Sequence, residues 1–577
     1  MATKGYDYII VGGGSAGCAL ANRLTSDGSA NVLVIEAGHR SSRFDLPVRV
    51  PSAFLFLFGK SFYDWQYKSE PEPWLNNRRI EHYRGKLMGG SSAINGMFFQ
   101  RGNALSYEQW GELPGLQHWD YAHVLPYFKR CERYMSADVH NPYRGRSGPI
   151  PVEASPADGP LFGAFFDAVR QAGHEVVDDV NAYRQEGFSS FDRNISRGER
   201  YSSARAYVDP IRHRKNLDVV TGALVSKVVF EGTRAVGVEL SSRRGGKNIV
   251  RGAEVILCGG AFNSPQLLQL SGIGAADELR RLGIDVVHHL PGVGENLQDH
   301  LEAFVMYACT QPVSILPYLK PKAWPGVGLK WLFQRSGVAA TNHFEAGGFV
   351  RSNEDVVMPN QMMTLLPVGV RNDGTPAPTP HAYQINIAPQ TPTSVGHVKL
   401  RSKDPSAHPI LRFNYLSTEQ DRKEWIEVVH MARDILNQPA FAPFNGGELS
   451  PGHSVRTDEE ILEWVARDAE TSYHPCGTAK MGIGEDSVVH PDTMRVHGVD
   501  GLRVVDASVM PIMPNANLYA PVMMIAEKAA DLILGVDPLP AEHVPFYRHE
   551  PTSAADMRNG KPASRARKNA ASVTATG

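Results

Sequence analysis

The sequence predicts an α/β protein, because short β-rich runs alternate with helical segments along most of its 577 residues. The N-terminus gives the clearest pattern: an apolar run at residues 8–11, a glycine turn, a helical pattern and a second apolar run at residues 32–35. Residues 216–257 read as successive strands separated by turns, and apolar spacing predicts a helix near residues 423–437. A chain of this length is too long for one core and is expected to form two large domains.

The N-terminal pattern has the glycine spacing of a dinucleotide-binding turn. Gly12 permits the tight turn, Gly14 lets the backbone approach a pyrophosphate, and Gly17 lets the helix pack closely on the strand. The helix that follows presents unpaired N–H groups and the positive end of its dipole to the phosphates. Glu36, at the end of the second strand, can accept both hydrogen bonds of a ribose diol and would repel the additional phosphate of NADP. The turn and its context therefore predict a bound ADP moiety.

The composition is that of an ordinary globular protein, with 42% hydrophobic and 21% charged residues. A formal net charge of −2 argues against nucleic acid as the main partner, because no basic excess is available to neutralise phosphates. The five cysteines have no CxxC spacing and predict reduced core thiols in a cytoplasmic protein, rather than a disulfide framework or a metal site. We expect neither a secretory signal before the first strand nor a membrane-spanning segment.

A second glycine-rich segment, RGKLMGGSSAINGMFFQRG, occupies residues 84–102. Two adjacent glycines before two serines would allow another close approach of the backbone to phosphate, with hydroxyl groups as additional donors. A plain surface turn explains the same pattern. The segment alone leaves both interpretations open.

Together with four further motifs, this segment resembles the glucose–methanol–choline (GMC) family of flavin oxidoreductases. The motifs are GAFNSPQLLQLSGIG (residues 260–274), LPGVGENLQDH (290–300), TSYHPCGTAKMG (471–482) and LRVVDASVMP (502–511). They occur in the family's order, and the resemblance covers residues 6–535. GERYSSARAYV and HFEAGGFVRS are most similar to the bacterial choline dehydrogenase-like and aliphatic alcohol dehydrogenase-like branch.

The resemblance implies a Rossmann-like FAD-binding domain assembled from separated segments, and a substrate domain whose largely antiparallel sheet is backed by helices. The expected FAD-binding domain comprises residues 1–155, 211–305 and 489–550, and the expected substrate-binding domain comprises residues 156–210 and 306–488. The flavin would lie at the domain boundary. Residues 551–577 are rich in Ala, Ser, Arg and Lys without periodicity, and are expected to form a disordered tail.

Carried onto this sequence, the resemblance assigns a set of residues to FAD. The glycine turn would hold the pyrophosphate, Glu36 the adenosine ribose, and Val225 the adenine through its backbone. The second glycine segment would flank the pyrophosphate and the isoalloxazine, and Asp506 with Ala507 would bind the ribityl and pyrophosphate region. The full set is Gly12, Gly14, Ser15, Ala16, Gly17, Glu36, Ala37, Arg84, Gly89, Gly90, Ser91, Asn95, Gly96, Met97, Val225, Asp506, Ala507 and Leu518.

The mode of flavin attachment depends on one position of the second glycine segment. Some members of the family attach their flavin covalently through a histidine there. Ile94 stands at that position in this sequence, and an alkyl side chain cannot form the bond. We therefore expect non-covalent FAD.

Oxidation of an alcohol by a flavin needs removal of the hydroxyl proton and transfer of a hydride from carbon to the flavin. A neutral imidazole suits the first event, because its ordinary pKa lies near the operating pH. The resemblance places the active-site base at His474, whose backbone is restricted to extended geometry by the following proline. It places Asn517 as the partner that holds the substrate oxygen; this residue could also be the N-cap of the following helix.

The substrate residues are expected to be mainly apolar. The candidates are Met97, Phe98, Phe99, Glu345, Tyr473 and Tyr519. Phe98 and Phe99 favour aliphatic or aromatic primary alcohols over polyols. Choline is less favoured, although Glu345 could supply a carboxylate for a cationic substrate. Tyr519 departs from the usual sequence of the nearest relatives and is expected to fill space rather than to act in catalysis.

Residues 311–340 are unusually apolar for a surface connection and mix aromatic, aliphatic and basic residues with prolines and glycines. The segment could be a lid over the flavin pocket, a contact with a membrane surface, or an ordinary packed excursion. We expect a cytoplasmic protein, with a position peripheral to the inner membrane as the alternative that this segment leaves open.

The predicted function is FAD-dependent oxidation of a primary alcohol to the aldehyde, with a dehydrogenase favoured over an oxidase. A quinone, an electron-transfer protein or oxygen could accept the electrons. The alternatives are an oxygen-using alcohol oxidase, a choline dehydrogenase and, from another class, a flavin-dependent lyase or photodecarboxylase. A non-catalytic flavin-binding protein is disfavoured, because His474 and Asn517 are both present.

Overall fold

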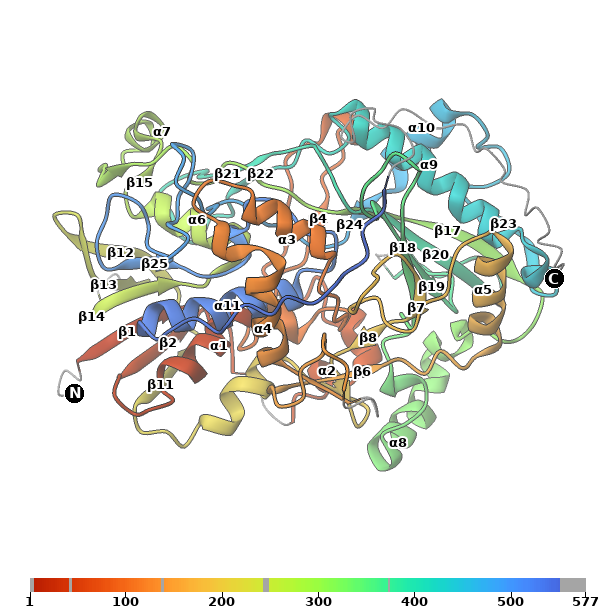
Figure 1. The fold of residues 1–577 in the computed structure, drawn as a ribbon, viewed down its shortest axis with the longest axis horizontal. Helices are drawn as coiled ribbons and strands as arrows, with labels where there is room; N and C mark the ends of the chain where they lie inside the picture. Colours follow the sequence, from red (N-terminus) through yellow and green to blue (C-terminus); the bar gives the residue numbers. More distant parts are fainter. Residues whose placement is uncertain (1–4, 41–43, 136–139, 242–247, 372–373, 551–577) are drawn as a thin grey trace, which may run out of the picture.

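The computed structural model describes residues 5–40, 44–135, 140–241, 248–371 and 374–550. The tail expected at residues 551–577 lies outside this part of the chain. Figure 1 shows an elongated molecule with one sheet toward each end, and the first and last helices of the chain side by side in one half. The architecture is mixed α/β, as the sequence predicts.

The first sheet has seven strands, in the order β11-β2-β1-β14-β13-β12, with β25 beside β14. Their bounds are β1 (Tyr6–Val11), β2 (Val32–Glu36), β11 (Leu217–Thr221), β12 (Val225–Glu231), β13 (Arg234–Leu240), β14 (Asn248–Leu257) and β25 (Leu502–Val504). Pairing is parallel from β11 through β14 to β25, and antiparallel among β14, β13 and β12. The strands predicted at residues 216–257 are confirmed, and β2 ends at Glu36 as expected.

Two apolar helices bind the two ends of the chain together. Helix α1 (Ser15–Leu24) links β1 to β2, and α11 (Tyr519–Leu534) packs against it. Helix α11 is buried along nearly its whole length, as expected for a helix that is apolar on most sides. Its Asp531 Oδ1 lies 2.8 Å from Nη2 of Arg23 in α1 and 2.8 Å from Nη1 of Arg130 in α4 (Tyr121–Cys131).

The second sheet is antiparallel, in the order β18-β19-β20-β17-β23, with β24 beside β17. Its strands are β17 (Leu301–Cys309), β18 (Ala346–Val350), β19 (Gln361–Leu366), β20 (Ala382–Pro389), β23 (Asn445–Ser450) and β24 (Glu470–Thr471). Every residue of β20 is buried, because α9 (Glu419–Leu436) packs over this sheet (Figure 1). Helix α9 is the helix predicted at residues 423–437; it begins earlier because the Thr418 side chain caps it by accepting from Asp421 N.

Shorter elements connect these two halves. Other helices are α2 (Leu46–Arg49), α3 (Ala104–Gly111), α5 (Pro160–Gln171), α6 (Gly260–Leu270), α7 (Ala276–Arg281), α8 (Trp324–Gln334) and α10 (Asp458–Asp468). Short strands are β3 (Tyr67–Lys68), β4 (Glu81–His82), β5 (Glu132–Tyr134), β6 (Ile150–Ala154), β7 (Gly187–Ser190), β8 (Asp192–Arg193), β9 (Ile195–Ser196), β10 (Glu199–Arg200), β15 (Ile273–Gly274), β16 (His288–His289), β21 (His397–Lys399) and β22 (Ile410–Arg412). Because β17 begins at Leu301, the second sheet starts before the domain boundary expected at residue 305; the division into domains otherwise stays a prediction.

The cysteines and the helices bear on two further expectations. Cys18, Cys131, Cys258, Cys309 and Cys476 are all buried and unpaired, as expected for core thiols. Within the described ranges, no helix combines the length and the apolar character needed to cross a membrane.

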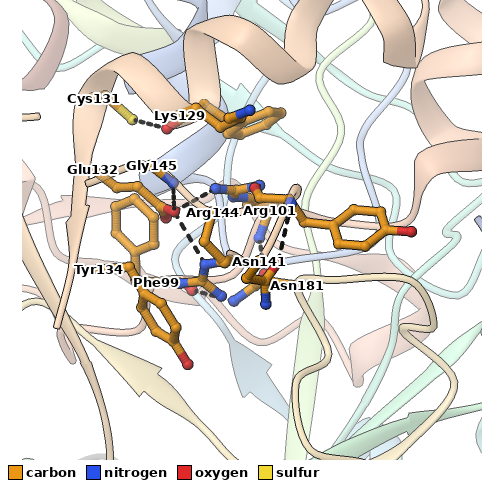
Figure 2. A network of polar contacts seen from close by, with 12 residues as sticks. Phe99, Arg101, Lys129, Cys131, Glu132, Tyr134, Asn141, Arg144, Gly145 and Asn181 are labelled. Carbon is orange, nitrogen blue, oxygen red and sulfur yellow. Dashed lines mark hydrogen bonds and ion pairs between the residues drawn. The ribbon is translucent and has the colours of Figure 1, made fainter. Parts of the chain in front are cut away.

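A buried ionic network lies beside the second glycine segment (Figure 2). At its centre, Arg144 Nη1 is 2.6 Å from Asp192 Oδ2 and 3.0 Å from Asp179 Oδ1. Arg144 Nε is 3.0 Å from Glu132 Oε1, and Arg101 Nη2 is 2.6 Å from the same oxygen. Burial raises the pKa of Asp192 to about 6, although the nearby Arg144 opposes that shift. Three carboxylates therefore share Arg144, and Glu132 also contacts Arg101.

The same network holds the backbone near the end of the second glycine segment. The Asn181 amide donates to Phe99 O at 2.9 Å and accepts from Arg101 N at 2.8 Å. Its Nδ2 also donates to Asp192 Oδ2 at 2.8 Å. The network therefore holds the backbone of residues 99–101 in place (Figure 2).

Replacing Arg144 by methionine should destabilise the protein, because the buried carboxylates of Glu132 and Asp192 and the partly exposed one of Asp179 would lose the cation that they share. Breaking a buried ion pair in this way costs about 3–5 kcal/mol, which urea unfolding would detect as a lower free energy of unfolding. Arg170→Met is the matched control, because Arg170 pairs with Asp167 on the surface and an exposed pair contributes at most about 1 kcal/mol. Equal unfolding midpoints for the two variants would contradict this account of the network.

Candidate active site

A cavity of about 530 Å³ joins both glycine segments to the second sheet. It is lined by most of the predicted site residues: Gly12, Gly14, Ser15, Ala16, Glu36, Ala37, Arg84, Gly90, Ser91, Asn95, Gly96, Met97, Phe98, Val225, Tyr473, His474, Asp506, Ala507, Asn517, Leu518 and Tyr519. Strands β19 and β20 contribute Thr364, Gln384 and Asn386 to its wall. Gly17, Gly89, Phe99 and Glu345 do not line it.

The geometry of the first glycine turn explains each of its glycines. Gly12 has φ +105°, and a Cβ atom on it would lie 2.4 Å from Cys258 O. A Cβ atom on Gly17 would lie 2.0 Å from Gly12 O, so Gly17 acts in helix–strand packing rather than at the cavity wall. Gly14 has no atom closer than 3.8 Å to its Cβ position, which leaves room for a ligand beside its backbone. No side chain caps the start of α1, so its first N–H groups are available to an anion.

The second glycine segment packs directly on this turn. Gly89 N donates to Gly13 O at 2.7 Å, and a Cβ atom on Gly90 would lie 2.8 Å from Gly14 Cα. Both Gly89 and Gly90 are buried. A plain surface turn is therefore the wrong interpretation of this segment.

The acid at the end of β2 is suitably placed for a ribose. Glu36 Oε2 accepts from Gly13 N and Oε1 from Gly38 N, each at 2.8 Å, so each oxygen retains a lone pair for a ligand hydroxyl. Burial raises the pKa of Glu36 to about 7. Together with the open start of α1, this arrangement fits the adenosine diphosphate part of FAD.

Asp506 also lines the cavity. Its carboxylate accepts from Gly260 N at 2.8 Å, from Ser264 Oγ at 2.5 Å and from Ser508 N at 2.8 Å. Burial raises its pKa, and these hydrogen bonds oppose the shift. Asp506 therefore orients the backbone around Ala507, which also lines the cavity.

The predicted catalytic pair meets in the cavity. His474 Nε2 lies 3.1 Å from Asn517 Nδ2, and His474 Nδ1 lies 3.0 Å from His300 Nδ1. Burial, then His300 and Arg84, hold the pKa of His474 well below its usual value, so the imidazole is neutral near pH 7 and can accept a proton. The alternative role of Asn517 is corrected: Leu518 is the N-cap of α11, and the Asn517 side chain contacts His474 instead.

The loop that carries His474 is held on both sides. Asp299 Oδ1 accepts from His474 N at 2.8 Å, and Oδ2 accepts from Thr471 Oγ1 at 2.6 Å. Tyr473 adopts the left-handed φ of +64°, a conformation that a non-glycine residue keeps only when its surroundings impose it. Arg84 Nη2 donates to Tyr473 O at 2.6 Å and so contributes to that constraint. Arg84 thus lines the cavity but also anchors the catalytic loop.

The side chains of Met97 and Tyr519 form part of the cavity wall. Met97 has φ +61°, and its N–H donates to Asn95 Oδ1 at 3.1 Å. Tyr519 lies with its hydroxyl 3.0 Å from Ser203 Oγ and its ring centroid 6.1 Å from that of Phe99. These contacts agree with the expectation that Tyr519 fills space.

Near the catalytic loop, an acid and three aromatic rings line the cavity together. The ring of Phe58 lies 4.8 Å from that of Tyr83 and 5.5 Å from that of Tyr473, measured between centroids. Glu302 lies in the same wall, and Ser472 Oγ donates to its Oε2 at 3.3 Å. Sequence reasoning missed Glu302, although it stands two residues after the LPGVGENLQDH motif.

Two predicted substrate residues lie away from the cavity, and their roles are corrected. Glu345 Oε2 accepts from Ala157 N at 3.0 Å and Oε1 from Thr341 Oγ1 at 2.5 Å, so its carboxylate is used inside the protein. Phe99 is fully buried in the core of the first half. Phe98, its neighbour, does line the cavity.

Residues 311–340 form one wall of the cavity. Those in the wall are Ile315, Tyr318, Leu319, Trp324, Val327, Gly328, Trp331, Val338 and Ala339. Leu329, Leu332 and Phe333 of α8 are exposed. The segment therefore contributes to the cavity wall, and its role as a lid stays a prediction.

Comparison with protein families gives two matches that together span most of the chain. The N-terminal domain of GMC oxidoreductases matches residues 6–302, and the C-terminal domain of GMC oxidoreductases matches residues 392–526. Among curated proteins, the "oxygen-dependent choline dehydrogenase" of Staphylococcus saprophyticus is 53% identical over 548 residues, which cover 95% of this chain and 98% of the relative. The protein of the same description from Staphylococcus aureus strain MSSA476 is 52% identical over 548 residues, which cover 95% of this chain and 96% of the relative.

Solved structures resemble this one over most of its length. Pyridoxine 4-oxidase from Mesorbium loti superposes with a TM-score of 0.82 at 30% identity, covering 92% of this chain and 100% of that chain. An arginine-to-alanine variant of formate oxidase from Aspergillus oryzae, solved to show the effect of this mutation on FAD modification, superposes with a TM-score of 0.85 at 26% identity, covering 92% of this chain and 98% of that chain.

Replacing His474 by alanine should lower the rate constant of flavin reduction by about two to four orders of magnitude, the span of a lost general base. In the unmodified enzyme this rate should fall as the pH drops through the pKa of His474, because the imidazolium cannot accept a proton. Since burial lowers that pKa, the acidic limb should lie below the ordinary histidine value of about 6.5. Anaerobic stopped-flow absorbance measures both; a flavin-loaded variant that keeps the unmodified rate would exclude His474 as the base.

Acid precipitation should separate FAD from the protein. Ile94 lines the cavity at the position where some family members carry the histidine that bonds to the flavin. The alkyl side chain of Ile94 cannot form such a bond. We expect a yellow supernatant and a colourless pellet, measured by absorbance of both fractions. Flavin absorbance that stays in the washed pellet would contradict this prediction.

Proposed function

Because the chain belongs to the GMC oxidoreductase family and uses FAD, we propose that it oxidises choline, a primary alcohol with a quaternary ammonium group, to the corresponding aldehyde. The observation that carries this proposal is that Glu302, which accepts from Ser472 beside Tyr473, lines the same cavity as aromatic residues and His474. Relatives more than half identical to this chain are described as choline dehydrogenases. Choline replaces the apolar aliphatic or aromatic alcohol expected from Phe98 and Phe99, which the comparisons do not support.

The chemistry of a quaternary ammonium ion suits this wall. Such an ion cannot donate hydrogen bonds, so it is recognised by the faces of aromatic rings and by a nearby negative charge. Tyr83 and Tyr473, whose ring centroids are 5.4 Å apart, and the carboxylate of Glu302 offer both. In the register of the second sheet, Glu302 pairs with Glu470, close to the start of the loop that carries His474. The cation subsite and the base thus lie near each other, as the two-carbon spacing of choline requires.

The residues around His474 support alcohol oxidation. Its neutral imidazole accepts the proton of the substrate hydroxyl, and Asn517 holds the substrate oxygen beside Nε2. When bound, FAD supplies the acceptor for a hydride from the carbon that bears this oxygen. The wall formed by residues 311–340 limits the access of water to the cavity.

A lyase or photodecarboxylase on the same scaffold is the alternative from another class. The His474–Asn517 pair favours oxidation over that alternative, because a base beside an amide is what proton removal from an alcohol needs. Anaerobic reduction of the flavin by the substrate alone would distinguish the two. A lyase leaves its flavin oxidised after turnover.

We propose oxygen as an acceptor that reoxidises the flavin, on the basis of the relatives described as oxygen-dependent. A quinone or an electron-transfer protein is the other acceptor expected for a dehydrogenase. Contact between residues 311–340 and a membrane surface stays a prediction. Its support is the exposed apolar side chains of α8 beside exposed lysines such as Lys330.

Replacing Glu302 by glutamine should lower kcat/KM for choline by about 100-fold, since loss of a charge partner in a desolvated site costs about 2–5 kcal/mol and Glu302 is only half-buried. The uncharged isostere 3,3-dimethylbutan-1-ol should lose little, because it has no cation to pair. Steady-state kinetics with both alcohols measure the selectivity ratio. Glu345→Gln is the control: its carboxylate lies outside the cavity, so the ratio should not change. An unchanged ratio in the Glu302 variant would refute the cation subsite.

A further inference from the structure

We propose that His300, together with the main-chain carbonyl of Gln390, fixes the tautomer of His474, so that the lone pair of His474 is on Nε2. This inference rests on the proposed role of His474 as the base, and it makes His300 a positioning residue. The contacts that carry it are His300 Nε2 to Gln390 O at 3.1 Å and His300 Nδ1 to His474 Nδ1 at 3.0 Å.

The order of donors and acceptors follows from the carbonyl. A main-chain carbonyl oxygen only accepts, so Nε2 of His300 must carry the hydrogen in that contact. Burial lowers the pKa of His300 to about 4, so its ring is neutral near pH 7 and Nδ1 keeps a lone pair. The 3.0 Å contact between the two Nδ1 atoms then requires the hydrogen on the side of His474. Nε2 of His474 is left with the lone pair.

The other tautomer of His474 conflicts with this arrangement. With the hydrogen on Nε2, the two Nδ1 lone pairs would face each other at 3.0 Å. Nε2–H would also face the amide group of Asn517 assigned as a donor, at 3.1 Å. In that state the ring could not take a proton from a hydroxyl group at the cavity. One fixed carbonyl therefore selects the form of the imidazole that works as a base.

Gln390 and His300, which begin this chain of contacts, are both held in place by the surrounding protein. Gln390 follows the end of β20, is 1% exposed, and its N–H donates to Asn360 O at 2.8 Å. His300 is fully buried, and its own carbonyl accepts from Ser472 N at 2.8 Å. Hydrogen bonds therefore hold Gln390 beside the second sheet and His300 beside the loop that carries His474.

The same contacts set the path of the transferred proton. When His474 Nε2 takes the hydroxyl proton, Nδ1–H still donates to the neutral His300 ring. His300 cannot pass a proton onward, because its Nε2–H already faces a carbonyl that takes none. The proton therefore remains on Nε2 of His474 and is later released from that atom, on the cavity side.

The first test is a direct measurement on the unmodified holoenzyme. With ¹⁵N-labelled histidine, the imidazole shifts of His474, assigned by their absence in His474→Ala, report which nitrogen carries the hydrogen. We expect protonation at Nδ1 and a bare Nε2. A bare Nδ1 would overturn the proposal, and this result does not depend on which alcohol is the substrate.

The second test compares two variants. His300→Leu removes the acceptor and should slow flavin reduction by about 10- to 1,000-fold, the range for partners that orient a reacting group. His300→Asn places an amide oxygen where Nδ1 stood and should recover the rate to within about tenfold of the unmodified enzyme on the same reasoning. Both rates refer to flavin-loaded protein in anaerobic stopped-flow. Equal losses in the two variants, or no loss in His300→Leu, would overturn the proposal.

Discussion

The catalytic end of the cavity depends on the buried carboxylate of Asp299. Removing a carboxylate from water is unfavourable unless its lone pairs are used, and here they accept from His474 N, Thr471 Oγ1 and, at 2.5 Å, Tyr415 OH. Burial raises the pKa of Asp299 to about 6, and these hydrogen bonds oppose the shift. The carboxylate thus ties the catalytic loop to the start of the second sheet. Together with Arg84, which donates to Tyr473 O, it holds the left-handed turn at Tyr473 and the backbone of His474.

Asp299 is also the first residue of a short segment, residues 299–302, whose polar side chains act at one site. His300 contacts the ring of His474, and Glu302 lines the cavity. Alternation along an extended strand places these two on the same side and Leu301 on the other, where it packs in the core of the second half. The segment that leads into β17 therefore supplies the carboxylate that holds the His474 backbone, the partner of the His474 imidazole and the acid proposed to bind the cation. The site lies between the two sheets, because residues of both line the cavity.

The sequence predicted what local chemistry determines. The glycine turn, the acid at the end of β2 and the long helix α9 depend on spacing within a few residues, and the structure has all three. His474 and Asn517 were found only because their motifs resemble a family, since 43 residues separate two side chains that touch. Glu302 was missed although it follows the LPGVGENLQDH motif by two residues, because a single acid in a strand looks like any surface residue. Phe99 was misplaced since adjacent residues of an extended segment face opposite sides, and Glu345 was misplaced because its partners come from distant loops.

We propose that one cavity holds a cationic alcohol with its hydroxyl group at His474. The most direct test mixes the anaerobic, FAD-loaded enzyme with choline and follows the absorbance of the oxidised flavin. The account predicts complete loss of that absorbance, with one equivalent of the aldehyde formed per flavin. A flavin that stays oxidised with choline, yet is reduced by an uncharged primary alcohol, would contradict it.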